Sequence, residues 1–124
     1  MIFGIGTDLV DVERIKKKVE SDQGFKEKIF TLHEIEYCET QTFKAENYAA
    51  RFAAKEAFLK ALGTGWIGEL AFHEIEVSKD GLGKPFLRLY GKTKAHIDQN
   101  GIKNLHLSLS HIKSIAQAVV ILEK

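Results

Sequence analysis

Residues 51–65 read RFAAKEAFLKALGTG, a run of strong helix formers that predicts the central helix of the fold. At about 100° per residue, Arg51 and Lys55 lie on one side of this helix. The same count places Glu56 and Lys60 on a different side, roughly 140–180° from Arg51. A surface helix ordinarily has one polar face and one apolar stripe. Two charged sides separated by bulky apolar groups therefore indicate that at least one pair faces something other than open water.

A solvated ion pair is the alternative interpretation of the second charged side. Glu56 followed by Lys60 is the favoured i, i+4 order for an ion pair on a helix. Most exposed pairs of this kind contribute little to stability. The helix alone leaves both interpretations open, and the surrounding sequence has to decide between them.

The composition is that of an ordinary globular chain, and we expect residues 1–124 to form one domain with a real core. Hydrophobic residues make up 44% and charged residues 28%, and the net charge of +1 provides no basic field for nucleic acid. Cys38 is the only cysteine, which excludes an intramolecular disulfide and a cysteine-rich zinc site and fits a reducing compartment. The sequence has no signal peptide and no apolar run of membrane-spanning length, so we expect a cytoplasmic protein.

Outward from the central helix, the chain alternates between helical and strand patterns. Residues 2–10 predict a buried strand, and glycine inside a strand often marks a bulge or a close backbone approach. Helices are expected at 11–20, 25–30, 32–39 with Thr31 as N-cap, 45–62 ending at Gly63, and 91–101. Further strands are expected at 72–80, 84–91, 105–112 and 114–123. This order predicts the α+β class, with helices packed on one face of a mostly antiparallel sheet.

Two carboxylates occupy unusual places in this pattern. Asp8 lies at the end of an apolar strand beside two glycines, and Glu56 lies on the two-sided helix. Carboxylates from separate elements suit magnesium, which prefers oxygen ligands and keeps several waters. Lys60, one turn beyond Glu56, is placed to hold a phosphate oxygen near the same ion. The alternative for Asp8 is a turn or helix-cap aspartate, which strand ends often carry.

The remaining chemistry-bearing residues form no recognisable constellation. His111 ends the strand pattern 105–112, and this pattern alone favours a surface turn histidine. The histidines show no His-x-x-x-His spacing of the kind that binds zinc. The sequence also contains neither a Walker loop nor a Gly-x-Ser-x-Gly elbow.

Three segments together resemble one known family. They are GIGTDLVDVERI at 4–15, RFAAKEAFLKALGTG at 51–65 and LSLSH at 107–111, with DGLGKP at 80–85 also fitting the pattern. In this order and chain length they resemble holo-acyl carrier protein synthases, the small, bacterial-type 4′-phosphopantetheinyl transferases. The resemblance covers nearly the whole chain, although residues 21–47 are not distinctive.

The resemblance implies a fold, a reaction and a set of site residues. The fold is that of 4′-phosphopantetheinyl transferases. The reaction moves the 4′-phosphopantetheine group of coenzyme A to a serine of apo-acyl carrier protein, releases adenosine 3′,5′-bisphosphate and supports fatty acid biosynthesis. Magnesium would be held by Asp8 and Glu56, with Lys60 neutralising phosphate charge and Glu56 helping to deprotonate the serine. Coenzyme A contacts are implied for Arg51, Lys60, Gly63, Pro85, Ser110 and His111.

The resemblance also implies partners. Family members are homotrimers whose active site lies between subunits, with Ser110 and His111 supplied by the neighbouring chain. Arg14 and Lys18, in a basic run after Asp11, would contact the acidic carrier protein. A solvated helix face is the alternative for such a charge cluster.

Two rival functions use the same residues differently. A magnesium-dependent phosphodiesterase or nuclease also uses Asp, Glu and Lys, but usually places Glu-x-Lys on a strand, whereas Glu56 and Lys60 have helical spacing. A non-catalytic trimeric module that binds nucleotides or carrier proteins would need no metal.

Overall fold

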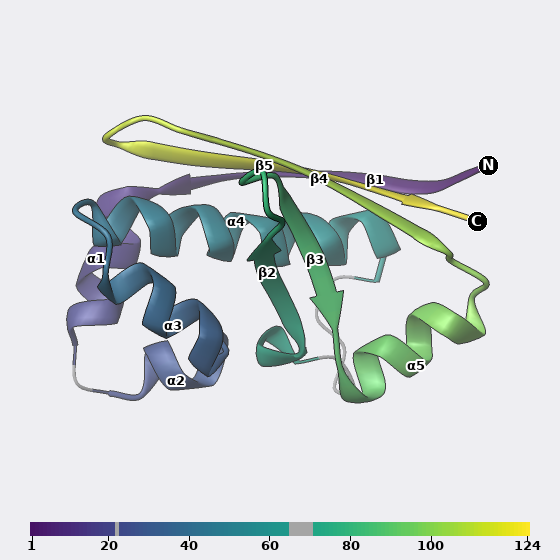
Figure 1. Ribbon diagram of the computed structural model, residues 1–124, viewed down its shortest axis with the longest axis horizontal. Helices are drawn as coiled ribbons and strands as arrows, with labels where there is room; N and C mark the ends of the chain where they lie inside the picture. Colours follow the sequence, from purple (N-terminus) through teal and green to yellow (C-terminus); the bar gives the residue numbers. More distant parts are fainter. Residues whose placement is uncertain (22, 65–70) are drawn as a thin grey trace.

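The computed structural model describes residues 1–21, 23–64 and 71–124, so Gly65 of the central motif and Asp22, between the first two expected helices, lie outside the described residues. Its elements follow one another as shown in Figure 1. They are β1 (Ile2–Asp11), α1 (Val12–Glu20), α2 (Phe25–Ile29), α3 (Leu32–Glu39), α4 (Lys44–Leu62), η1 (Phe72–Glu74), β2 (Ile75–Lys79), β3 (Pro85–Leu89), α5 (Gly91–Gln99), β4 (Asn104–His111) and β5 (Ile115–Glu123).

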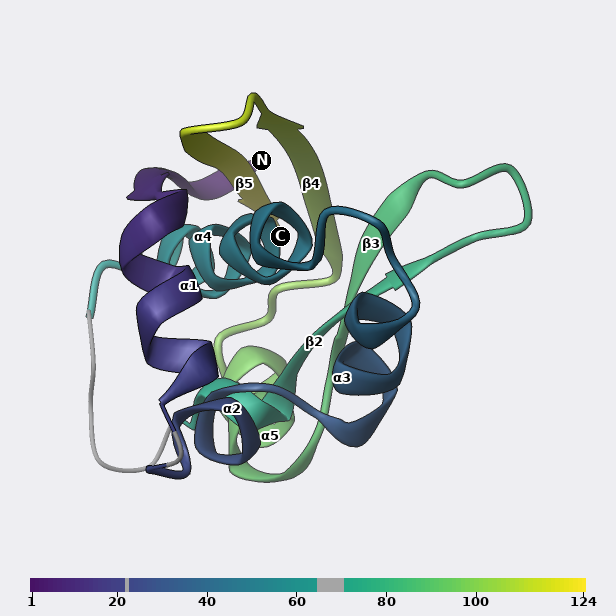
Figure 2. The same cartoon turned by 90° about the vertical axis from the view of Figure 1, so that its left-hand side faces the viewer.

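A three-stranded antiparallel sheet in the order β1-β5-β4 covers α4. Figure 1 shows α4 running along this sheet, and Figure 2 shows the same helix nearly end-on beneath it. Ala116, Ala118, Val120 and Leu122 alternate along β5 and are fully buried, because side chains of a strand point alternately to its two faces. The α+β class with antiparallel strands is therefore confirmed.

The other two strands form a separate sheet. β2 and β3 pair as an antiparallel hairpin whose loop projects from the body of the protein (Figure 2). The expected strand at 72–80 begins with a 3₁₀ turn, η1, and only then becomes β2. Lys55 of α4 donates hydrogen bonds to the carbonyl oxygens of Phe72 and Ile75, which ties this turn to the helix. The single sheet that the strand patterns predicted is thus divided into two.

Three helix ends are capped by residues that are common at such positions. Asp11 caps α1 by accepting from the backbone amides of Glu13 and Arg14. Thr31 and Glu34 form a capping box at the start of α3, as predicted. Gly63 closes α4 with φ of 81°, a left-handed conformation that favours glycine.

The charged side of α4 that carries Arg51 and Lys55 faces the protein interior. Lys55 is fully buried and its Nζ lies 2.7 Å from Oε1 of Glu34, which is also fully buried. Glu34 Oε2 additionally accepts from the backbone N–H of Val77 in β2. The inference that one charged pair faces something other than water is confirmed, but Lys55 faces the chain's own Glu34 and not a ligand.

Cys38 lies in the core with no exposed surface, as expected for a passive thiol. Burial raises the pKa of its side chain to about 12, so the thiol stays protonated at neutral pH. None of the helices in the described ranges has the length and hydropathy needed to cross a membrane.

The closest approach in the fold brings the backbone of β1 against α4. A Cβ atom on Gly6 would overlap the carbonyl oxygen of Ala57, and one on Gly4 would overlap that of Ala61. Alanines on this side of the helix complete the contact, since their small side chains let the helix lie against the strand. This contact fixes the distance between β1 and the side chains that project from α4.

Gly6→Ala should push β1 away from α4, because the added methyl group has no space. We expect a loss of about 1–3 kcal/mol in the free energy of unfolding, measured by urea denaturation. Gly81→Ala is the matched control, because a Cβ at Gly81 meets no atom within 4 Å. Equal stability of the two variants would contradict the close contact.

Candidate active site

The predicted metal ligands meet where β1 passes α4. Asp8 follows Gly6 by two residues and therefore points to the same face of β1, toward the helix. Glu56 and Lys60 lie one turn apart on α4. Arg14, in the first turns of α1, is close enough to influence the ionisation of Glu56. Three elements thus bring two carboxylates and two cations together.

Lys60 bridges strand and helix. Its Nζ lies 2.9 Å from Oδ1 of Asp8, and the Asp8 side chain is only 15% exposed. The helical ion pair with Glu56, which the i, i+4 spacing allowed, is not the one formed among the described residues: Lys60 pairs with Asp8. The second charged side of α4 therefore faces Asp8 of β1, and Lys60 forms its ion pair with this strand instead of with Glu56.

Glu56 has an environment that resists ionisation. Partial burial raises the pKa of this carboxyl group, and the nearby negative charge of Asp8 raises it further. Lys60 and Arg14 act in the opposite direction but do not cancel the first two effects. Two carboxylates that repel each other in a half-buried position form a site that a cation would stabilise.

The donor set fits magnesium better than a metal that needs many protein ligands. Among the residues that the structure describes, no cluster of three or more His, Cys, Asp or Glu side chains could hold a metal. Magnesium is commonly bound through one or two carboxylates, with waters and substrate phosphates filling its other positions. Asp8 and Glu56 are thus sufficient for magnesium bound together with a phosphate substrate, and insufficient for a structural zinc site.

Arg51 lies on the other side of α4, where it is only 3% exposed. Its guanidinium stacks over the ring of Tyr37 with 4.3 Å between Cζ and the ring centroid. No carboxylate within the described ranges forms an ion pair with Arg51, and its Nε has no hydrogen-bond partner there. A buried guanidinium without a counter-ion is unusual and is available for an anion.

His111 lies at the opposite end of α4 from the carboxylate pair. Its Nδ1 is 2.9 Å from Oε1 of Glu46, in the first turn of the helix. Glu46 and Glu56 are ten residues apart, which corresponds to roughly 15 Å along a helix. Ser110, adjacent in β4, is exposed on the other face of the sheet.

The other predicted contacts are spread over the molecule. Gly63 ends α4 and Pro85 begins β3, where it pairs with Lys79. Arg14 and Lys18 are exposed on α1, and Lys18 Nζ lies 5.5 Å from the ring centroid of Phe25. A single chain therefore brings Asp8, Glu56, Lys60 and Arg14 together but leaves Arg51, Ser110 and His111 away from this group.

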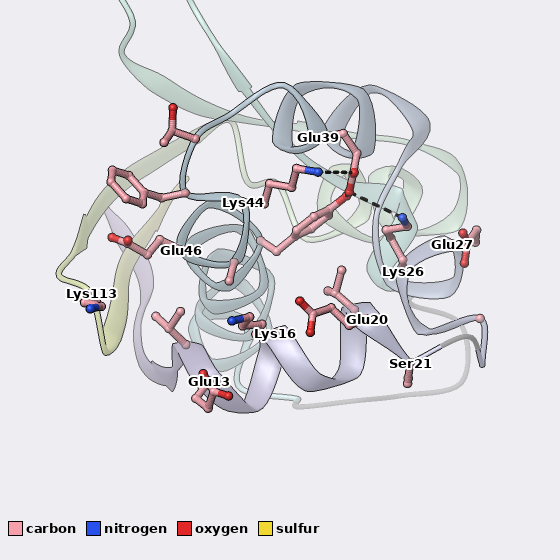
Figure 3. Close-up of a pocket in the computed structure, with 17 residues that line it drawn as sticks. Glu13, Lys16, Glu20, Ser21, Lys26, Glu27, Glu39, Lys44, Glu46 and Lys113 are labelled. Carbon is pink, nitrogen blue, oxygen red and sulfur yellow. Dashed lines mark hydrogen bonds and ion pairs between the residues drawn. The ribbon is translucent and has the colours of Figure 1, made fainter.

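A groove of about 710 Å³ that no sequence pattern predicts lies between α1, α2 and the start of α4 (Figure 3). Near its floor, Glu39 accepts a 2.7 Å hydrogen bond from the hydroxyl of buried Tyr48 and pairs with Lys26 and Lys44. These partners are distant or offset in the sequence, so no local pattern reveals them. In the described part of the chain, none of the residues predicted for the site lines this groove.

Glu56→Gln should stabilise the metal-free protein near neutral pH. The pKa of Glu56 is raised in the folded state. The contribution of Glu56 to the stability of the protein is therefore fully present below the unfolded pKa of about 4.5 and is lost as pH rises through the folded pKa. Glutamine cannot ionise and does not suffer this decline. Melting temperatures measured with a chelator should favour the variant at pH 7, and this advantage should shrink toward pH 4.

Glu123→Gln provides a control of opposite sign. A hydrogen bond from His106 lowers the pKa of Glu123, so its carboxylate stabilises the fold above the unfolded pKa and the effect is lost as pH falls. That variant should be less stable than the native chain at pH 7. A Glu56→Gln variant that is likewise less stable would refute the repulsion between Glu56 and Asp8.

Residues 4–119 match the family model described as the 4′-phosphopantetheinyl transferase superfamily. The holo-[acyl-carrier-protein] synthase of Syntrophus aciditrophicus is 50% identical over 124 residues, which cover 99% of this chain and 97% of that protein.

Solved structures show the same fold. The holo-[acyl-carrier-protein] synthase of Neisseria meningitidis superposes with a TM-score of 0.92 at 37% identity, covering 100% of both chains. That of Helicobacter pylori, in complex with coenzyme A, gives 0.84 at 35% identity, covering 96% of this chain and 99% of that one. The chain therefore belongs to the holo-[acyl-carrier-protein] synthase family of the 4′-phosphopantetheinyl transferase superfamily, and it is an enzyme of this class.

Proposed function

We propose that this enzyme transfers the 4′-phosphopantetheine group of coenzyme A to a serine of apo-acyl carrier protein with the help of magnesium. The observation that carries the proposal is the group of Asp8, Glu56 and Lys60 where β1 meets α4. Two carboxylates and an ammonium group in one place suit a divalent cation and a pyrophosphate together. The complex of the Helicobacter pylori relative with coenzyme A supports the choice of substrate.

The reaction is phosphoryl transfer to a hydroxyl group. The serine oxygen forms a bond to the phosphorus that carries pantetheine, the bond from this phosphorus to the bridging oxygen breaks, and adenosine 3′,5′-bisphosphate leaves. Positioning and charge neutralisation carry most of the catalysis in such reactions. Magnesium, held by Asp8 and Glu56, would neutralise charge on the pyrophosphate.

The chain's own side chains have separate roles in this proposal. Lys60, whose side chain is 54% exposed, contributes its ammonium group to the phosphate oxygens. Glu56, besides helping to hold magnesium, takes the proton of the serine hydroxyl. Arg51, whose Nε has no hydrogen-bond partner within the described residues, supplies its guanidinium to another phosphate of coenzyme A, with Gly63 and Pro85 as further contacts.

We propose that the enzyme is a homotrimer with active sites between subunits. The face of the three-stranded sheet away from α4 carries Ile5 and Leu9, which are 62% and 72% exposed, beside the half-buried Val119 and Ile121. A contiguous apolar surface of this kind commonly marks a protein–protein interface. Assembly would also explain why Ser110 and His111 lie far from Glu56 within one chain, because a neighbour would supply them.

The carrier protein is proposed to dock on α1. Arg14 and Lys18 are exposed there, together with Lys17, and Arg14 lies close enough to influence Glu56. A basic helix suits an acidic partner because opposite charges accelerate association. The reaction would take place in the cytoplasm and support fatty acid biosynthesis.

One assay tests the whole proposal. Purified enzyme is incubated with coenzyme A, magnesium and an apo-acyl carrier protein, and the carrier is then weighed by mass spectrometry. The carrier should gain the mass of one phosphopantetheine group. A nuclease or a binding module would leave the mass of the carrier unchanged.

Asp8→Ala and Glu56→Ala should each abolish most transfer, because each removes half of the protein ligands to magnesium. Lys60→Ala should keep both carboxylates and still bind magnesium, but slow transfer roughly 10²–10³-fold through the loss of charge stabilisation. Rates are measured against magnesium concentration. Lys94→Ala is the control, since Lys94 forms a similar exposed ion pair with Asp98 at 3.1 Å. Normal turnover of Glu56→Ala would exclude the metal site.

Mixed trimers should reveal a shared site. At a low coenzyme A concentration, a mixture of Asp8→Ala chains, which lack a proposed metal ligand, and His111→Ala chains, which bind coenzyme A weakly, should recover part of the activity after unfolding and refolding together, because some interfaces then contain both native residues. The mixture is assayed beside each variant refolded alone. A fully active monomer in ultracentrifugation at assay concentration would contradict the shared site.

Arg14→Glu should raise the KM for carrier protein and leave the KM for coenzyme A nearly unchanged. The charge reversal weakens attraction to an acidic surface, and this attraction is screened over about 10 Å at 0.1 M salt. Steady-state kinetics at two salt concentrations measure both effects. An unchanged KM for carrier protein would remove Arg14 from the docking surface.

A further inference from the structure

Glu46 and His111 form a contact that neither the sequence pattern nor the proposed reaction includes. Glu46 lies in the first turn of α4, and His111 is the last residue of β4. The distance from His111 Nδ1 to Glu46 Oε1 is 2.9 Å. The Glu46 side chain is 13% exposed and that of His111 is 39% exposed, so the carboxylate is the sheltered partner.

The sheet register determines the face of the sheet to which His111 points. His111 pairs with Ala116 of β5, and paired residues of an antiparallel ladder point to the same face. Ala116 is fully buried against the helix side of the sheet, so His111 also points toward α4. The start of α4 presents Glu46 to the ring at this point.

The hydrogen bond to Glu46 determines which nitrogen of His111 carries a proton and where the other nitrogen points. An ionised carboxylate only accepts hydrogen bonds, so Nδ1 must carry the proton in this contact. Nε2 lies across the imidazole ring and is directed away from Glu46. When the ring is charged, Nε2–H is a donor for a phosphate oxygen, and the carboxylate balances the positive charge.

We propose that Glu46 is a positioning residue that orients His111 so that its Nε2 contacts a phosphate of coenzyme A. This inference rests on the proposed function, in which His111 binds coenzyme A at a neighbouring subunit's site. Glu46 itself touches no substrate. It acts by fixing the ring of His111 and the nitrogen that carries its proton.

The chain offers a matched control for this dyad. His106 Nε2 lies 2.7 Å from Oε1 of Glu123, so a second histidine–glutamate pair is present in the same sheet. His106 pairs with Ile121 in the register and therefore lies on the face away from α4. The control pair has the same chemistry and no proposed contact with substrate. Because its face of the sheet is the proposed subunit interface, the control is a Glu123→Ala protein that ultracentrifugation shows to have the native oligomeric state.

A double-mutant cycle tests the coupling. Glu46→Ala and His111→Ala should each raise the KM for coenzyme A on the order of tenfold, with kcat and the KM for carrier protein nearly unchanged. Adding Glu46→Ala to the His111→Ala chain should cause no further change, because Glu46 acts through the histidine. Glu123→Ala should leave all three constants near their native values. A Glu46→Ala effect that persists in full in the His111→Ala background would overturn the proposal.

A second measurement does not depend on activity. Long-range ¹H–¹⁵N correlation NMR reports which nitrogen of neutral His111 carries the proton. We expect Nδ1–H in the native chain and in Glu46→Gln, whose amide oxygen still accepts a hydrogen bond, and Nε2–H in Glu46→Ala. Glu46→Gln should also retain more affinity for coenzyme A than Glu46→Ala. An unchanged tautomer in Glu46→Ala would likewise overturn the proposal.

Two further arms separate related outcomes. The KM for coenzyme A that lacks its 3′-phosphate should not change with Glu46→Ala if His111 contacts that phosphate. This KM should still rise with Glu46→Ala if His111 contacts the pyrophosphate. Failure of the proposed function appears elsewhere, as native enzyme that adds no mass to the carrier protein. Native transfer activity combined with an unchanged KM for coenzyme A in His111→Ala would overturn only the role given to Glu46.

Discussion

The structure depends on the contact between the glycine backbone of β1 and α4. Gly4 and Gly6 lie so close to the carbonyl oxygens of Ala61 and Ala57 that any side chain would overlap them. Through this contact Asp8, two residues beyond Gly6, reaches the ammonium group of Lys60 at 2.9 Å. A wider separation would leave the two halves of the site out of reach of each other. The glycines are thus a requirement of the site as much as of the packing.

The charges of α4 divide into three roles that its sequence does not distinguish. Lys55 is buried with Glu34 and holds α3, η1 and β2 against the helix. Removing one partner of such a pair leaves an unpaired buried charge and costs about 3–5 kcal/mol. Arg51, one turn away, is almost equally buried but has no carboxylate partner within the described residues. Glu56 and Lys60 belong to the shared site with β1. Burial alone therefore does not separate a structural charge from one that is available to an anion; the presence of a partner does.

Local chemistry determines the parts of the fold that the sequence predicts well. Thr31 with Glu34, Asp11 and Gly63 act within one helical turn of the ends that they define, so the helix limits were predicted to within about one residue. The partition of strands into two sheets depends on long-range contacts, such as Lys55 with the carbonyl of Phe72, and periodicity cannot reveal it. The Asp8 and Glu56 pair was identified because both carboxylates stand out from apolar surroundings. The roles of Glu46 and Tyr37 could not be predicted from the sequence. Glu46 contacts His111, which is distant in the sequence, and Tyr37 contacts Arg51, which lies on a different helix.

The length of α4 separates His111 from the carboxylate group within one chain. The helix presents the carboxylate Glu56 near its middle and holds His111 through Glu46 near its start, roughly 15 Å away. A rigid helix cannot bring these two positions together within one molecule. A closed ring of identical copies can, because each interface then joins the middle of one α4 to the start of the next. In such an assembly, Glu46 would affect the binding of coenzyme A by holding His111, and Asp8 and Glu56 would hold magnesium, although the two groups lie in different parts of every chain.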